Sequence, residues 1–207
     1  KSTNEIRNMK ILHLLSGGLD STILLGYLNT LKNHEIKCLT FDYGQTHKKE
    51  ILAAKEISND YNCDHKIIKA NFFPGCALVG DKTLKDGPSE TAIVPNRNMV
   101  FLSIAAAYAI QKNIRFISWA VVKDDADIFK DCRYDFWQKM NQALSHTKIQ
   151  ILAPYINKTK KEIVNQAIKK GYPFEKSWSC YRGGTKPCGK CNACILRKEA
   201  IDEAKSI

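Results

Sequence analysis

The sequence lacks the features that would place it in a membrane or in a repeat protein. No run of apolar residues reaches the ~20 needed to cross a bilayer, no charged and then apolar leader opens the chain, and no internal repeat or low-complexity tract is present. Its 207 residues, 44% apolar and 26% charged, fit one globular domain with a small appendage. We therefore expect a cytoplasmic enzyme with no membrane partner.

A long basic tract is also missing, although the formal net charge is +11. The lysines are scattered, with small clusters at Lys158, Lys160 and Lys161 and at Lys169 and Lys170. No basic run interleaved with aromatic residues marks a nucleic-acid groove. This distribution favours a solvated surface, and the charge neither requires nor excludes a nucleic-acid partner.

Two common nucleotide-binding motifs, G-x-x-x-x-G-K-[ST] and G-x-G-x-x-G, are absent as well. A kinase-type P-loop and a dinucleotide site are therefore disfavoured. The chain has instead an apolar strand, Lys10–Leu15, that runs directly into Ser16-Gly-Gly-Leu-Asp-Ser21 and a helix. Two glycines allow successive backbone N–H groups to converge on an anion, and the N-terminus of the next helix adds a positive dipole end. The segment predicts a phosphate-binding loop.

Strand and helix signals alternate along most of the chain, which predicts an α/β fold with a parallel twisted sheet and helices on both faces. The expected strands are 10–15, 36–41, 65–70, 114–122 and 149–152, and the expected helices are 21–31, 48–59, 98–111, 133–145 and 159–170. We expect one α/β domain over residues 9–175. Residues 1–8 are polar and are expected to be a flexible lead-in or a cloning remnant.

In a parallel sheet, ligands bind beyond the carboxyl ends of the strands. The loops at 16–21, 41–45 and 122–133 are therefore expected on one rim. The helix expected at 99–110 is apolar on every side, which predicts burial between layers or a place in a subunit interface.

Four cysteines near the end of the chain have the spacing of a metal site: Cys180, Cys188, Cys191 and Cys194. Overlapping C-x-x-C pairs bring neighbouring thiolates onto one ion, and four thiolates close a tetrahedron around structural Zn²⁺. An iron–sulfur cluster is the main alternative, whereas an intracellular compartment disfavours disulfides. Residues 176–207 are expected to form this zinc-binding segment and a terminal helix.

The loop Ser16–Ser21 resembles the S-G-G-x-D-S pyrophosphate loop of the ATP pyrophosphatases. Together with the four cysteines, it resembles the 7-cyano-7-deazaguanine synthase family. Further motifs carry the resemblance along the chain: Phe41-Asp-Tyr-Gly-Gln45 with His47 and Glu50, Val94-Pro-Asn-Arg-Asn98, Asp131-Cys-Arg133, Thr159-Lys-x-Glu-Ile163, Ser177-Trp-Ser-Cys-Tyr181 and Leu196-Arg197. The implied fold is adenine nucleotide alpha hydrolase-like and Rossmann-like.

The resemblance implies an ATP-dependent ligase of the queuosine pathway that joins 7-carboxy-7-deazaguanine and ammonia into a nitrile, through adenylated acid and amide intermediates. It implies a homodimer and Mg²⁺ at Asp20. The implied ATP-binding residues are Leu15, Ser16, Gly17, Gly18, Leu19, Asp20, Ser21, Thr22, Phe41, Asp42, Tyr43 and Gly44.

The other implied site residues face the acid substrate or the departing pyrophosphate. Arg97 and Lys160 are expected to neutralise charge as pyrophosphate leaves. Asp131 and Arg133 are expected to bind the deazaguanine edge and the substrate carboxylate, with catalytic roles. The remaining substrate contacts are expected from Gln45, His47, Asn98 and Cys132.

The chain departs from the family pattern at Lys123–Lys130, where the family has an acidic-aromatic run that ends like Ser-Gly-Tyr-Pro. Leu19 and Thr46 stand where Gln and Arg are frequent. A divergent member therefore stays open: a related adenylating enzyme with a protein or nucleic-acid acceptor, or a tRNA-modifying enzyme. A zinc-ribbon nucleic-acid module without turnover is a further alternative, against which the intact loop Ser16–Ser21 counts.

Overall fold

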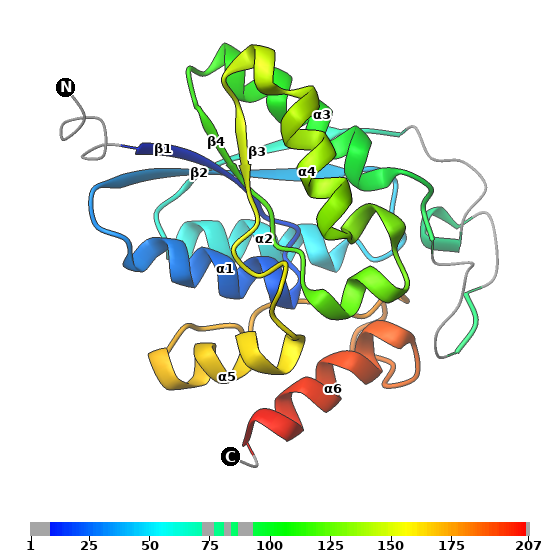
Figure 1. The fold of residues 1–207 in the computed structure, drawn as a ribbon. Coiled ribbons are helices and arrows are strands. Elements are labelled where there is room, and N and C mark those ends of the chain that lie inside the picture. The colour runs from blue at the N-terminus through cyan, green and yellow to red at the C-terminus, as the bar shows by residue number, and fades with distance from the viewer. Residues whose placement is uncertain (1–8, 72–76, 81–83, 87–92, 206–207) are drawn as a thin grey trace.

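Five parallel strands form the centre of the molecule, in the order β3-β2-β1-β4-β5 (Figure 1). The computed structural model describes residues 9–71, 77–80, 84–86 and 93–205, so the expected lead-in at 1–8 lies outside the described residues. The strands are β1 (Met9–Leu14), β2 (His34–Asp42), β3 (Asp64–Lys69), β4 (Phe116–Ser118) and β5 (Gln150–Leu152). Every pair of neighbours is parallel, which confirms the predicted sheet.

Helices cover both faces of this sheet, as predicted (Figure 1). Helices α1 (Leu19–Thr30) and α2 (Lys49–Asp60) lie on one face, and α3 (Arg97–Gln111) and α4 (Tyr134–Ala143) lie on the other. Helices α5 (Lys160–Lys170) and α6 (Asn192–Lys205) pack against each other beyond α1. Short 3₁₀ turns at Lys123–Asp127 and Lys130–Cys132 lead from β4 to α4.

Alternating side chains of β1 divide the core between the two faces, because successive residues of a strand point in opposite directions. Ile11 packs in the cluster that contains Ile23 of α1 and Ile163 of α5. Leu12 packs in the other cluster, with Leu102 of α3. Both β1 residues are fully buried, as expected for a strand at the centre of a parallel sheet.

Two predicted elements differ from the structure. The strand expected at 114–122 is shorter in the structure, where β4 covers Phe116–Ser118. One further backbone bond to β5 flanks it on each side, from Gln150 N–H to Arg115 O and from Trp119 N–H to Leu152 O. Helix α3 is buried on one side only. Its other side exposes Met99 and Ile110 to solvent, so burial between layers is wrong and a place in a subunit interface stays a prediction.

The tail packs against the rest of the chain. Ala200 and Ala204 of α6 belong to the same core cluster as α1 and α5. The domain boundary at 175/176 stays a prediction.

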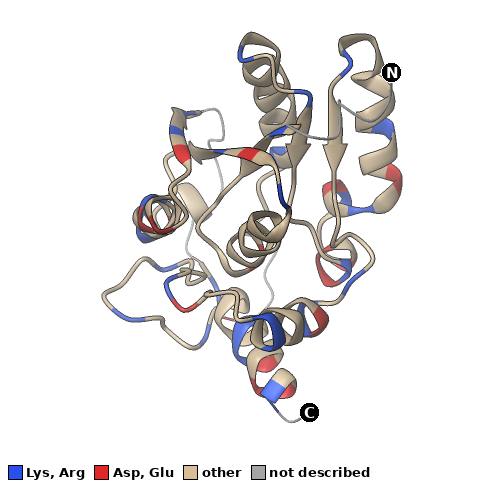
Figure 2. Cartoon of the chain, turned by 90° about the vertical axis from the view of Figure 1, so that its left-hand side faces the viewer, with Lys and Arg blue, Asp and Glu red and all other residues tan. Residues whose placement is uncertain are grey.

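Charged residues are distributed over the helices and loops, with Asp and Glu between the Lys and Arg residues (Figure 2). Within the described residues, no helix has both the length and the hydrophobicity to span a bilayer.

Candidate functional site

A cavity of about 260 Å³ opens at the carboxyl ends of β1, β2 and β4. The strand order reverses between β1 and β4, which is where ligands bind in open α/β sheets. The walls come from the loop after β1, the end of β2, the start of α3, the segment after β4 and the tail. The predicted rim therefore contains the site, and the tail closes it.

The phosphate-binding loop connects β1 to α1 through a conformation that requires glycine. Gly17 has φ +88°, and a Cβ there would lie 2.1 Å from the carbonyl oxygen of Glu50. Gly18 N–H donates to Ser16 Oγ at 3.0 Å, and the Ser16 and Ser21 hydroxyls are 3.0 Å apart. Helix α1 begins directly after, so its N-terminus points at the cavity.

A buried histidine supports this loop from inside the sheet. His13 Nε2 donates to Ser21 O at 2.9 Å, and its Nδ1 accepts from Ser118 Oγ at 3.2 Å. Burial lowers the pKa of His13 to about 4, although the Ser21 carbonyl opposes this shift, so the ring is neutral at pH 7. The imidazole thereby links β1, β4 and the first turn of α1. Nothing in the sequence pattern beyond a polar residue in an apolar strand indicated this role.

Lys160 lies between two carboxylates on the cavity wall. Its Nζ is 2.5 Å from Asp20 Oδ2 and 3.8 Å from Asp125 Oδ1. Burial lowers the pKa of Lys160, but the two carboxylates outweigh it and raise the pKa overall. Burial raises the pKa of Asp125 to about 6, with Lys160 opposing and Asp20 adding to the shift. Lys160 therefore stays charged and is paired in the free protein.

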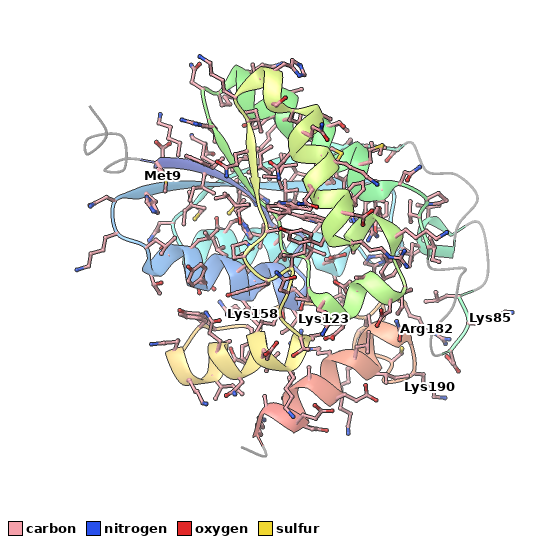
Figure 3. All side chains as sticks on the ribbon, viewed as in Figure 1. Met9, Lys85, Lys123, Lys158, Arg182 and Lys190 are labelled. Atoms are coloured by element: carbon pink, nitrogen blue, oxygen red, sulfur yellow. The ribbon has the colours of Figure 1, made fainter. Side chains whose placement is uncertain are left out.

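The start of α5 is held so that Lys160 meets the phosphate loop. Thr159 caps the helix in a capping box with Glu162. Lys160 N–H donates to Asp124 Oδ2 at 2.6 Å. Asp124 belongs to the 3₁₀ turn Lys123–Asp127. Lys123 of this turn lies beside Lys158, just before α5 (Figure 3), and Lys123 N–H donates to Lys158 O at 2.8 Å.

Aromatic rings and a guanidinium form the wall between β2 and α3. Phe41 and Phe101 stack with ring centroids 4.1 Å apart. Arg97 Nη1 donates to the Tyr43 hydroxyl at 3.2 Å. Nearby, His47 Nε2 lies 2.9 Å from Glu50 Oε2, so these two residues orient one another.

The tail contacts the phosphate loop and the segment between β2 and α2. Trp178 N–H donates to Gly17 O at 2.8 Å, and Thr46 Oγ1 donates to Tyr181 O at 3.3 Å. Arg197 donates to Ser177 Oγ at 2.6 Å and to Ser179 Oγ at 3.3 Å. Trp178, Tyr181 and Arg197 all line the cavity, so the tail forms part of the site.

The four predicted metal ligands come together in this tail. The sulfur atoms of Cys180, Cys188, Cys191 and Cys194 all lie within 4.8 Å of one another. A tetrahedral ion with Zn–S bonds of ~2.3 Å places its sulfurs about 3.8 Å apart. Cys188 N–H points at Cys180 Sγ at 3.3 Å, and Cys191 N–H at Cys188 Sγ at 3.4 Å, which favours thiolates. The donor set and spacing fit one structural Zn²⁺.

A family model described as queuosine biosynthesis protein QueC matches residues 10–205. The chain belongs to this family. Two curated relatives, both 7-cyano-7-deazaguanine synthases, extend the match. That of Archaeoglobus fulgidus is 37% identical over 206 residues, with 93% of this chain and 86% of the relative covered. That of Thermoplasma acidophilum is 37% identical over 213 residues, with 95% and 89% covered. The resemblance inferred from the motifs is confirmed.

A solved structure shares the fold at lower identity. The U34-tRNA thiolase NcsA from Methanococcus maripaludis, with its 4Fe-4S cluster, matches with a TM-score of 0.60 and 18% identity. The match covers 97% of this chain, and the chain spans 66% of that protein's length. Likeness at this identity concerns the fold alone.

The structure brings most of the predicted QueC-family site residues to the cavity. The predicted residues that line it are Leu15, Ser16, Gly18, Leu19, Asp20, Ser21, Phe41, Tyr43, Gln45, His47, Arg97, Asn98, Cys132 and Lys160. Gly17, Thr22, Asp42 and Gly44 support the adjoining turns without lining the cavity. Burial raises the pKa of the Cys132 thiol, which is therefore neutral.

Asp131 and Arg133 are not brought to the cavity lining. Asp131 Oδ2 accepts the Asn98 N–H at 3.0 Å and so caps the N-terminus of α3. Arg133 is exposed, and its Nε donates to Ala126 O at 3.0 Å. Their substrate roles stay predictions, and this geometry gives both side chains other partners.

Several cavity residues have no counterpart among the predicted site residues: Trp119, Asp125, Phe129, Trp178, Ser179, Asn192 and Arg197. A signal existed for some of them. Asp125 and Phe129 lie in the segment expected on the rim, and Trp178 and Arg197 belong to motifs that carried the resemblance.

Metal removal tests the contact between tail and loop. We expect Cys191→Ser, or chelation of the wild type, to release the zinc and to weaken ATP binding by about 10-fold or more, because Trp178 loses its fixed position. Metal analysis and calorimetric titration with ATP measure both, with Cys63→Ser as a control cysteine outside the cluster. Added zinc should restore ATP binding to the chelated wild type. A zinc-free protein that binds ATP as tightly as the zinc-loaded protein would contradict this view.

The raised pKa of Asp125 predicts a pH-dependent stability. Between its unfolded pKa of about 4 and its folded pKa of about 6, the folded protein holds a proton that the unfolded chain has lost. Stability therefore falls as pH rises through this window. Asp125→Asn removes the effect, so the variant should gain roughly 1–3 kcal/mol relative to wild type between pH 4 and pH 7.

Urea unfolding at both pH values measures this gain. Asp127→Asn, a change at an exposed aspartate in the same turn, should show none. A pH-independent difference between Asp125→Asn and wild type would show that the carboxyl is not perturbed.

Proposed function

We propose that this chain is an ATP-dependent ligase that converts 7-carboxy-7-deazaguanine and ammonia into 7-cyano-7-deazaguanine. Membership of the QueC family over residues 10–205 supports the reaction class. The observation that carries the proposal is the cavity itself, in which the phosphate loop, Lys160 and the aromatic wall meet at the switch point of the sheet.

The chemistry requires two activations, because a carboxylate and an amide are both poor electrophiles. The carboxylate attacks the α-phosphorus of ATP and expels pyrophosphate, and ammonia then displaces AMP to leave the amide after loss of a proton. The amide oxygen attacks a second ATP in the same way. Loss of AMP and of the two protons on nitrogen gives the nitrile. The protein contributes mainly positioning and charge stabilisation.

The loop and the start of α1 suit the β- and γ-phosphates, since Ser16, Gly18 and Ser21 line the cavity where α1 begins. Lys160, next to Asp20, is placed to stabilise the negative charge that develops on departing pyrophosphate. Asp20 Oδ1 is buried without a partner among the described residues, so this oxygen is a suitable ligand for Mg²⁺. When bound, the ion neutralises phosphate oxygens.

A cytoplasmic location accords with this proposal, because four cysteine thiolates on zinc require a reducing compartment. A homodimer accords with the exposed side of α3. Met99, Ser103, Ala107 and Ile110 recur along one exposed stripe of this helix and offer uncharged side chains to a second copy.

The direct test incubates the zinc-loaded protein with 7-carboxy-7-deazaguanine, ATP, Mg²⁺ and ammonium, and follows the amide and nitrile by mass spectrometry. We expect both products. Asp20→Asn should lower turnover by about 100-fold or more while zinc content stays at the wild-type level. A folded, zinc-loaded wild type that forms neither product would refute the proposed reaction, and undiminished turnover by Asp20→Asn would refute the role of that carboxylate.

The dimer surface is tested separately. Ile110→Glu places a charge in the stripe and should shift the protein to a monomer in sedimentation velocity. Leu52→Glu, which alters an even more exposed apolar residue on α2, should leave the dimer intact. A wild type that sediments as a monomer at micromolar concentration would rule out this interface.

A further inference from the structure

Arg97 carries a charge on the cavity wall that forms no ion pair with a carboxylate of the described residues. It is the first residue of α3 and is partly buried. Among the described residues the one hydrogen bond of its guanidinium goes to the Tyr43 hydroxyl, and the guanidinium lies 5.7 Å from the centroid of that ring. Burial lowers the pKa of Arg97, but Tyr43, Tyr181 and Glu50 outweigh it, so the group stays charged. A buried charge of this kind favours an anionic partner.

The other two cations of the cavity are already engaged. Lys160 is paired with Asp20 and Asp125. Arg197 is held by Ser177, Ser179 and the Phe174 carbonyl. Arg97 therefore has the largest number of N–H donors available to a ligand.

The surroundings of Arg97 suit a flat ring system that carries a carboxylate. Phe41 and Phe101 stack with an interplanar angle of 6°, and Tyr43 lies 5.5 Å from Phe101, so the wall beside the guanidinium is aromatic. A planar guanidinium can hold both oxygens of a carboxylate with two parallel hydrogen bonds. Arg133, the arginine expected to do this, is exposed and outside the lining.

We infer that Arg97 binds the carboxylate of the acid substrate and so determines specificity in the first half of the reaction. This inference rests on the proposed function. The acid is an anion and the amide intermediate is neutral, so a residue that recognises the carboxylate matters for the first activation and little for the second. A residue that neutralises phosphate charge would matter equally for both, since each activation consumes ATP.

The two half-reactions can be measured apart, with the acid or the corresponding amide supplied as substrate. For Arg97→Gln we expect the KM for the acid to rise by about 30-fold or more, and turnover of the amide to nitrile to change by less than about 3-fold. Calorimetry without ATP should show weakened binding of the acid and unaltered binding of the amide. Arg115→Gln is the matched control, because Arg115 also lies over an aromatic ring, 5.6 Å from that of Phe116, but outside the cavity.

Arg97→Lys keeps the charge but loses the two parallel hydrogen bonds of the guanidinium, so it should raise the KM for the acid by about 10-fold. This variant tests recognition of the carboxylate even where Arg97→Gln does not fold. Equal losses with acid and amide would overturn the inference and assign Arg97 to the phosphates. Selective loss of the acid in Arg133→Gln, with Arg97→Gln unaffected, would overturn it as well. A wild type that converts the amide but not the acid, or neither, would instead refute the proposed function, and the inference with it.

Discussion

The hydrogen bond from Trp178 N–H to the Gly17 carbonyl joins the two ends of the chain, and the site depends on it. Gly17 can offer that carbonyl only because it adopts φ +88° and because its missing Cβ lets α2 approach at Glu50. The tail in turn is held in place by four cysteines around one position. The four-cysteine cluster and the cavity are therefore coupled through this backbone contact, although Trp178 lies 161 positions after Gly17 in the sequence.

The charges of the cavity are divided into a balanced and an unbalanced group. Lys160 forms ion pairs with both Asp20 and Asp125, so carboxylates of the protein neutralise its charge. Arg97, next to Tyr43, lacks such a partner among the described residues. Lys160 and Arg97 were both expected to neutralise the departing pyrophosphate, yet only Arg97 has a charge that is free to pair with a ligand. The difference follows from the side chains that the fold places around each of them.

The positions of Asp131, Cys132 and Arg133 show that neighbours in the sequence need not face the same site. Three consecutive residues were expected to face the substrate, but Asp131 and Cys132 end a 3₁₀ turn and Arg133 follows it in an extended conformation, so their side chains point in different directions. Asp131 caps α3, Cys132 reaches the cavity, and Arg133 faces solvent. Conversely, Asp125 reaches Lys160 because the turn at Lys123–Asp127 is tied to the start of α5 through Asp124.

The sequence by itself determined the fold class, the phosphate loop, most strands and helices, and the four metal ligands. These depend on periodicity and short spacing, which neighbouring residues define among themselves. Only the tertiary structure decided that His13 supports the loop, that Lys160 pairs with Asp20, and that the tail closes the cavity. Such contacts join residues that are far apart in the sequence or separated by a turn, and the free energy of each depends on the burial and charge that the whole fold creates around it.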